Sequence, residues 1–216
     1  MRPEIVRPTA LVLNICVSLI ATAQFTRAGH LRLDVLLPLA AASVPAAFVG
    51  GAIGLHPAAF EALLGLVLAA AAVRLGVRAA APRTITATPP GDAPRPMLLA
   101  ALGGVIGLLS GLTGIGGGVF LSPALLAIKA ASIREVAGVS AAFILVNSAS
   151  GLLGGIVGGA RVPATSLPIV VAAVVGGAAG AHLGANRLST RSLEGLMAAV
   201  LAVAATRLPV SYTHLR

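Results

Sequence analysis

The chain has 216 residues, of which 57% are hydrophobic and 10% are charged, and its formal net charge is +9. Soluble domains carry roughly 25% charged residues and the mean hydropathy here is +1.00, so the composition excludes an ordinary soluble domain and predicts an integral membrane protein. The positive charge does not indicate nucleic-acid binding. The arginines stand singly or in small groups at the ends of apolar runs, where the positive-inside rule places them.

The sequence offers little material for catalysis. Its single cysteine, Cys16, lies in an apolar run, excludes an internal disulfide and is expected to be a small packing residue. Neither a cluster of metal ligands nor a pair of buried carboxylates is present in the sequence. We therefore predict no enzyme, no catalytic or metal-binding residues and no cofactor.

Apolar runs of about 20 residues predict the membrane helices of the first half. They cover 8–26, 35–55 and 57–73, with a polar connection at 27–32. Pro38 and Pro45 lie inside the second run and are expected to kink it. Residues 79–96 are rich in proline and form the predicted linker between two halves.

The second half begins with an uncharged run at 97–128 that contains a glycine stretch at 111–118. Glycines destabilise a helix by about 1 kcal/mol each relative to alanine, so one helix should end near Thr113 and another should begin near Gly118. In a bilayer such a break is tolerated only where its free backbone groups face protein or a watery cavity. A charged connection at 129–135 and apolar runs at 136–160, 168–186 and 192–206 follow.

Glycines at this density can also serve helix packing or nucleotide binding. Small residues spaced by four, at Gly103, Gly107 and Gly111 and again at Gly114 and Gly118, describe a close helix–helix contact. On the unbroken part of the helix, Gly107→Ala is expected to be mild by comparison with Gly117→Val. Nucleotide-binding loops are excluded, because neither the Walker Lys-Ser/Thr nor the last glycine of the dinucleotide motif is present.

The two halves resemble each other after a shift of 133 residues. This shift places 62–75 over 195–208 and pairs Asn14 with Asn147 and Glu61 with Glu194. We therefore predict a first half-repeat at 1–78 and a second at 97–208. A partner for the glycine stretch would lie before residue 1, so the first half-repeat is expected to lack its start. Residues 209–216 continue no pattern and are expected to be a non-native tail.

The glycine stretch and its surroundings resemble a known family. Residues 111–123 (GLTGIGGGVFLSP), followed by Ala137-Gly138-Val139-Ser140, resemble the glycine signature and next helix of the TauE/SafE sulfite and organosulfonate exporters, and residues 8–14 resemble the equivalent helix of that family's first half. The resemblance implies an all-α bundle of two related halves. It also implies a multi-pass permease of the bacterial inner membrane that translocates a small anion such as sulfite or an organosulfonate, with coupling to protons left open.

The candidate substrate contacts lie at and around the break. An anion is expected to bind the free N–H groups at the positive end of the second helix. Mid-span amides and hydroxyls add contacts, although interhelical hydrogen bonds or local caps would explain these side chains equally well. The full set is Thr113, Gly114, Gly116, Gly117, Gly118, Ser122, Ser140, Asn147, Thr9 and Asn14.

Charge placement predicts the topology. If the segments on either side of the break form a re-entrant pair, ten basic side chains fall on the cytoplasmic side and four fall outside, as the positive-inside rule favours. The two halves are then inverted relative to each other. The expected partners are the lipid bilayer and a small anionic substrate, with homo-oligomerisation left open. The alternative is a non-transporting membrane subunit whose glycines only pack helices.

Overall fold

The computed structural model describes residues 3–53, 95–128, 130–160 and 167–184, which form a bundle of α-helices with no strand in these ranges. The runs predicted at 57–73 and 192–206, with Glu61 and Glu194, lie outside the described residues, as do most of the linker and the tail at 209–216. The helices are α1 (Pro3–Arg27), α2 (Leu33–Ala52), α4 (Pro96–Thr113), α5 (Gly118–Ala127), α6 (Ile133–Val157) and α7 (Leu167–His182).

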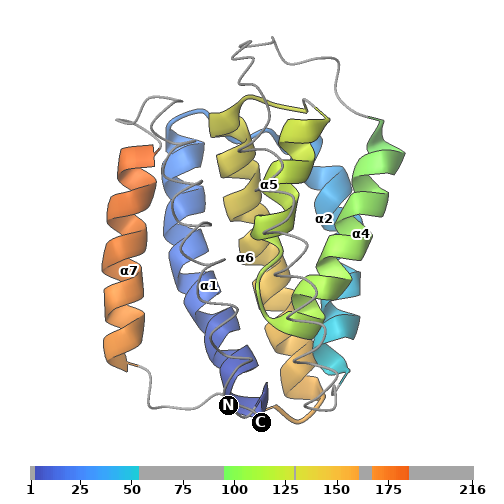
Figure 1. Ribbon diagram of the computed structural model, residues 1–216, viewed down its shortest axis with the longest axis vertical. Helices are drawn as coiled ribbons and strands as arrows, with labels where there is room; N and C mark the ends of the chain where they lie inside the picture. Colours follow the sequence, from blue (N-terminus) through green and yellow to red (C-terminus); the bar gives the residue numbers. More distant parts are fainter. Residues whose placement is uncertain (1–2, 54–94, 129, 161–166, 185–216) are drawn as a thin grey trace, which may run out of the picture.

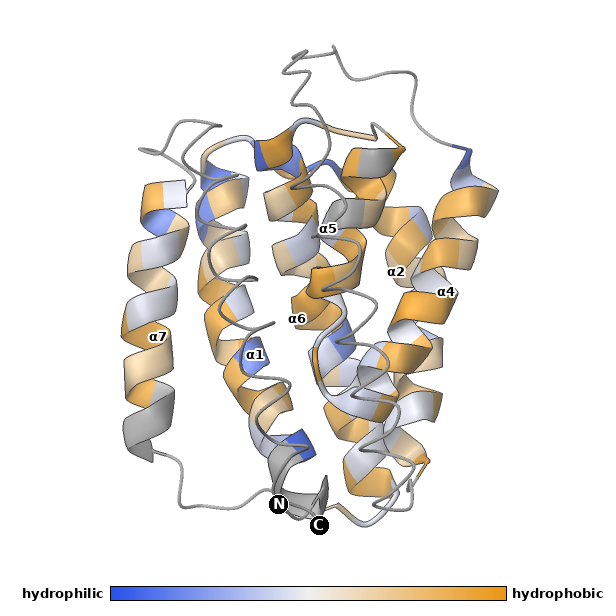
Figure 2. Cartoon of the chain, viewed as in Figure 1, coloured by the Kyte–Doolittle hydropathy of each residue, from blue (hydrophilic) through white to orange (hydrophobic). Residues whose placement is uncertain are grey.

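Four of these helices contain segments long and apolar enough to cross a membrane: Arg7–Arg27, Leu33–Ala52, Pro96–Thr113 and Ile133–Val157. Figure 2 shows that the helices consist largely of apolar residues or residues of intermediate hydropathy, with strongly hydrophilic positions mainly at helix ends and at a few places within the bundle. The predicted helical membrane class is therefore confirmed. The prolines Pro38 and Pro45 lie inside α2, which is continuous across them, and the kink expected there stays a prediction.

The helices run in both directions through the bundle. As drawn in Figure 1, α1 rises and α2 descends, and later in the chain α6 descends and α7 rises. Between these pairs α4 descends, the chain reverses, and α5 rises beside α6. The start of α4 and the end of α5 consequently lie at the same end of the bundle.

Helix α6 begins three residues earlier than predicted, because Ser132 caps it. The Ser132 hydroxyl accepts a hydrogen bond from the backbone N–H of Glu135 at 3.4 Å, and the Ser132 N–H donates to Glu135 Oε2 at 2.8 Å. This reciprocal pair is a capping box, which the spacing of Ser132 and Glu135 signals in the sequence. The expected start at residue 136 is thus corrected to Ile133.

Helices α2 and α4 pack backbone to backbone along a stripe of glycines. A Cβ added at Gly107 would lie 2.4 Å from the carbonyl oxygen of Ser43 and 2.6 Å from its Cα. Gly103 and Gly111 approach Leu39 and Ala47 equally closely. The helix-packing explanation is therefore right for these three glycines. The expectation that Gly107→Ala is mild is corrected, because the added methyl would overlap the backbone of α2.

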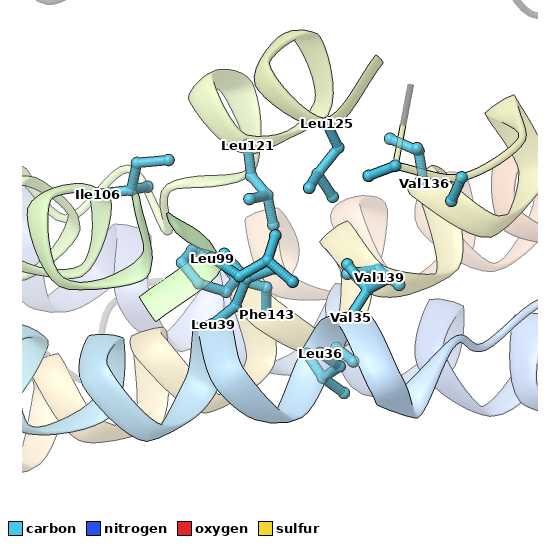
Figure 3. Close-up of a cluster of buried hydrophobic side chains, with 13 residues drawn as sticks. Val35, Leu36, Leu39, Leu99, Ile106, Leu121, Leu125, Val136, Val139 and Phe143 are labelled. Carbon is cyan, nitrogen blue, oxygen red and sulfur yellow. The ribbon is translucent and has the colours of Figure 1, made fainter. Parts of the chain in front are cut away.

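An apolar core joins α2, α4, α5 and α6 in the upper part of the bundle. Figure 3 shows Leu121 and Leu125 of α5 pointing towards Leu39, Phe143 and Val139. Leu121 and Leu125 are both fully buried. This core holds α5 in place and so fixes where the chain restarts after the break.

Candidate substrate site at the glycine break

Helix α4 ends at Thr113 and α5 begins at Gly118, as the sequence predicts. Between them Gly114, Gly116 and Gly117 adopt φ angles of +76°, +81° and +77°. These left-handed conformations cost a residue with a side chain roughly 1–2 kcal/mol each. The reversal of the chain therefore depends on glycine at all three positions.

The N-terminus of α5 presents backbone donors at the break. The N–H groups of Phe120 and Leu121 both donate to the carbonyl oxygen of Gly117 at 3.1 Å. The N–H groups of Gly118 and Val119 precede these bonds, in the part of a helix that has no intrahelical acceptor. Since such a helix end carries roughly half a positive elementary charge, it is suited to binding an anion.

Polar side chains from α1 and α6 meet at Gly116. A Cβ at this position would lie 2.9 Å from Asn14 Nδ2 and 3.2 Å from Ser148 Oγ. Asn14 Nδ2 also donates to the carbonyl oxygen of Gly114 at 3.2 Å. The absence of a side chain at Gly116 thus lets an amide from one long helix and a hydroxyl from another approach the same point of the break.

The neighbouring glycines face apolar groups. A Cβ on Gly117 would lie 2.9 Å from Ile106 Cγ2 and 3.0 Å from Phe143 Cε1, and one on Gly118 would lie 2.4 Å from Ile144 Cδ1. The break therefore has a polar side at Gly116 and an apolar side at Gly117 and Gly118.

Several buried polar atoms near the break have no hydrogen-bond partner among the described residues. They include Ser110 Oγ and Ser148 Oγ, on residues that contact the Cβ positions of Gly117 and Gly116, and Asn147 Oδ1, on the residue next to Ser148 in α6; the exposed fraction of all three residues is at most 1%. The Cβ of Ser110 lies 3.4 Å from the Cβ position of Gly117. Unpaired buried polar groups cost about 1–3 kcal/mol each, so these atoms are candidates for contact with a ligand.

Two of these residues, Ser110 and Ser148, are not among the predicted contacts. The sequence does place Ser110 directly before the glycine stretch and Ser148 next to Asn147. A hydroxyl close to a predicted contact is the signal that could have identified them. Helical geometry decides which of the neighbours faces the break, and the sequence alone does not reveal it.

The remaining predicted contacts lie elsewhere or bond locally. Thr113 Oγ1 donates to the carbonyl oxygen of Leu109 at 2.7 Å within α4. Ser122 and Ser140 lie 2.9 Å apart, oxygen to oxygen, and Ser122 also donates to the carbonyl oxygen of Gly118 at 3.0 Å. Thr9 lies half-buried on α1, more than one turn before Asn14. In this structure Thr113, Ser122 and Ser140 therefore make the local or interhelical hydrogen bonds that were the alternative to substrate contact.

Arg7 lies beside the break, although its place in the sequence indicates only one of the basic side chains that set the topology. Its Nη1 donates to the carbonyl oxygen of Ile53 at 3.1 Å, and its Nη2 donates to those of Gly50, at 3.1 Å, and Gly51. A Cβ on Gly114 would lie 3.0 Å from Arg7 Cγ. Arg7 thereby links α1, the C-terminal end of α2 and the break.

The amino-acid sequence of the chain is similar to that of known membrane transporters. The family model described as sulfite exporter TauE/SafE matches residues 1–208. The chain is 34% identical over 208 residues to the probable membrane transporter protein y4hK of Sinorhizobium fredii (strain NBRC 101917 / NGR234), an alignment that covers 95% of this chain and 83% of that protein. No solved structure matches the chain. The chain therefore belongs to the sulfite exporter TauE/SafE family, and it is a multi-pass membrane transporter.

Proposed function

We propose that the protein is a secondary transporter of a small anion such as sulfite or an organosulfonate in the bacterial inner membrane, and that the anion binds at the glycine break. The observation that carries the proposal is that three kinds of hydrogen-bond donor lie close together at the break: backbone N–H groups, an amide and a hydroxyl. The first backbone N–H groups of α5 follow Gly116, beside which lie Asn14 Nδ2 and the hydroxyl of Ser148, which has no partner among the described residues. Donors of this kind hold an oxyanion without adding a full buried charge, which would be costly in hydrocarbon.

The lengths of the helices support a site in the middle of the membrane. Helix α5 has 10 residues, so it is about 15 Å long, half of a hydrocarbon layer of about 30 Å. Asn14 and Asn147 lie near the middles of helices of 25 residues each. Discontinuous helices that meet near the midplane are where secondary transporters bind substrate.

We also propose that α4 and α5 form a re-entrant pair between two inverted half-repeats, at 1–78 and 97–208. The shift of 133 residues places α1 over α6 and α2 over α7. The paired helices run in opposite directions in Figure 1, which supports an inverted relation. The start of α4 and the end of α5 lie at the same end of the bundle, which supports the re-entrant pair.

Cysteine labelling tests this topology in a Cys16→Ala background. Arg95→Cys precedes α4 and Ile128→Cys follows α5, so both should react with an impermeant reagent from the same side of the membrane. Val157→Cys, exposed at the opposite end of α6, should react from the other side. Ile128 is suited to labelling because it is 38% exposed, whereas the nearby Ala131 is buried. Labelling of residues 95 and 128 from opposite sides would mean that α4 and α5 cross the membrane once.

Transport in proteoliposomes tests the function itself, with sulfite and methanesulfonate as substrates. Gly117→Val should abolish uptake, because valine disfavours the left-handed conformation and adds a branched side chain at the break. The matched control is Gly104→Ala, whose added Cβ meets only Ala42 Cβ at 3.8 Å. An imposed pH gradient in the same vesicles tests proton coupling, which requires uptake to change with the direction of the gradient.

The alternative function is that of a non-transporting membrane subunit. The glycine stripe at Gly103, Gly107 and Gly111 favours this alternative, because these three glycines pack α4 against α2. Full anion-dependent stabilisation and transport by Gly117→Val would assign the remaining glycines to packing as well. Absence of uptake by the purified wild-type protein for every anion tested would favour the subunit.

A further inference from the structure

The unpartnered atoms around the break include an acceptor as well as donors, and we propose that the site selects a singly charged anion that carries a hydrogen-bond donor of its own. Such anions include a protonated oxyanion or a sulfonate with a hydroxyl or ammonium group. This inference rests on the proposed function and specifies the substrate class of the same site.

The acceptor is Asn147 Oδ1. Asn147 is fully buried, and its Nδ2 donates to the carbonyl oxygen of Phe143 at 2.9 Å. A carbonyl can only accept, so this bond fixes the orientation of the amide and leaves Oδ1 without a partner in the described part of the chain. An anion with no donor would not satisfy it, and would bring its own negative charge close to the partial negative charge of this oxygen.

Asn147 lies on the stripe of α6 that faces the break. Ile144, one turn before it, contacts the Cβ positions of Gly116 and Gly118, and Ser148 contacts that of Gly116. One turn after it, the Cβ position of Gly151 lies 3.4 Å from the Cα of Gly111. Positions three and four residues apart share one helix face, so the buried amide is directed to the region between these contacts.

The donors lie around the same region. The hydroxyls of Ser110 and Ser148 are buried and lack a partner among the described residues, and each supplies one O–H group. The first N–H groups of α5 add backbone donors. These groups suit the oxygens of an anion, whereas Asn147 Oδ1 suits a donor on the same molecule. The arrangement therefore matches a ligand that both accepts and donates.

The charge near the break is too small for a dianion. Arg7 contributes one positive charge and the start of α5 roughly half of one, while the C-terminal ends of α2 and α4 contribute roughly minus half each, leaving about +0.5. Both of those C-terminal ends lie at the break: Arg7 bonds the last carbonyls of α2, and Gly114 closes α4. A second negative charge on the ligand would thus be buried without compensation, which is costly.

A size-matched pair of ligands tests the inference. 2-Hydroxyethanesulfonate and propane-1-sulfonate have the same charge and the same number of heavy atoms, but only the first carries a donor. We expect the first to bind about tenfold more tightly, the factor that corresponds to about 1.4 kcal/mol for one added hydrogen bond. Sulfate, a dianion, should bind at least about tenfold more weakly than 2-hydroxyethanesulfonate. Affinities are obtained from the ligand-dependent rise in melting temperature.

Variants assign the preference to the amide. Asn147→Leu should reduce the ratio of the two sulfonate affinities to about one, because leucine offers no acceptor. The matched control is Ser150→Ala on the same helix, which removes a buried hydroxyl that bonds the carbonyl oxygen of Val44 at 2.6 Å. This control should lower stability and leave the ratio unchanged.

The outcomes separate the inference from the proposed function. Equal binding of both sulfonates by the wild-type protein overturns the inference while leaving an anion site at the break. Retention of the preference in Asn147→Leu likewise overturns it. If sulfite, methanesulfonate and all three test anions fail to bind, the proposed function fails as well. The wild-type ratio requires no variant to fold, so the inference is decided even if Asn147→Leu is unstable.

Discussion

Replacement of Arg7 tests whether a side chain of α1 helps to hold the break in place, in addition to the glycines of the break itself. The guanidinium donates to the carbonyl oxygens of Gly50, Gly51 and Ile53, and the Arg7 side chain packs against Gly114. Arg7→Gln removes the charge and most of these bonds. Arg7→Lys keeps the charge, but a single ammonium does not reproduce the planar fork of a guanidinium. The two variants therefore separate hydrogen bonding from charge.

The expected magnitudes follow from the same contacts. Hydrogen bonds from charged groups contribute about 1.5–3 kcal/mol each when buried, but Arg7 is only half-buried and water replaces part of the loss. We therefore expect Arg7→Gln to lower the free energy of unfolding by about 1–3 kcal/mol, and Arg7→Lys by about half as much. Loss of the charge should also weaken anion binding by about tenfold, whereas Arg7→Lys should retain most of the affinity.

Unfolding can be followed through a side chain that the protein already contains. The chain has no tryptophan and one cysteine, and Cys16 is partly buried on α1, so a thiol-reactive dye follows unfolding. Arg27→Gln is the control, since it makes the same charge change on the same helix at an exposed position. It should cost at most about 1 kcal/mol through the helix dipole. Equal destabilisation by Arg7→Gln and Arg27→Gln would refute the bonding role of Arg7, and equal anion affinity would refute its electrostatic role.

Two further predictions concern contacts that the structure places close to the break. Gly107→Ala should lower the free energy of unfolding by about 1–3 kcal/mol through overlap with Ser43, whereas Gly104→Ala should be neutral or stabilising; comparable melting temperatures for the two variants would contradict the packing of α2 on α4. Ser122→Ala and Ser140→Ala should show a coupling energy of about 0.6 kcal/mol in a double-mutant cycle of unfolding free energies, and strict additivity would mean that their 2.9 Å contact contributes nothing.

The sequence is most informative where a residue type has one physical consequence. Clustered glycines end a helix, and the predicted break between Thr113 and Gly118 agrees with the last residue of α4 and the first residue of α5. Long uncharged runs have to be buried or face lipid, so the membrane class also follows directly. The start of α6 could have been predicted as well, because Ser132 and Glu135 have the spacing of a capping box.

The contacts at the site depend on tertiary geometry and could be predicted only in part. Asn14 was expected at the break and lies there, but Ser148 faces Gly116 because of the rotation of α6, which no local pattern specifies. Gly107 illustrates the opposite problem. Its four-residue spacing from Gly103 and Gly111 already marks it, unlike Gly104, as a packing glycine, but only the short distance to the backbone of α2 shows that an alanine would not fit there.

The glycines have separate structural roles, and this separation would allow one short segment both to hold the fold and to bind the proposed anion reversibly. The glycines of α4 before the break bring α2 and α4 into backbone contact, and the apolar core beside α5 holds Leu121 and Leu125. Rigid elements therefore border the break on both sides. The break itself is held by left-handed backbone angles and weak polar contacts. Because a helix end, hydroxyl groups and the half-buried Arg7 bind an anion less tightly than a fully buried arginine would, the proposed site can release its cargo, which transport requires.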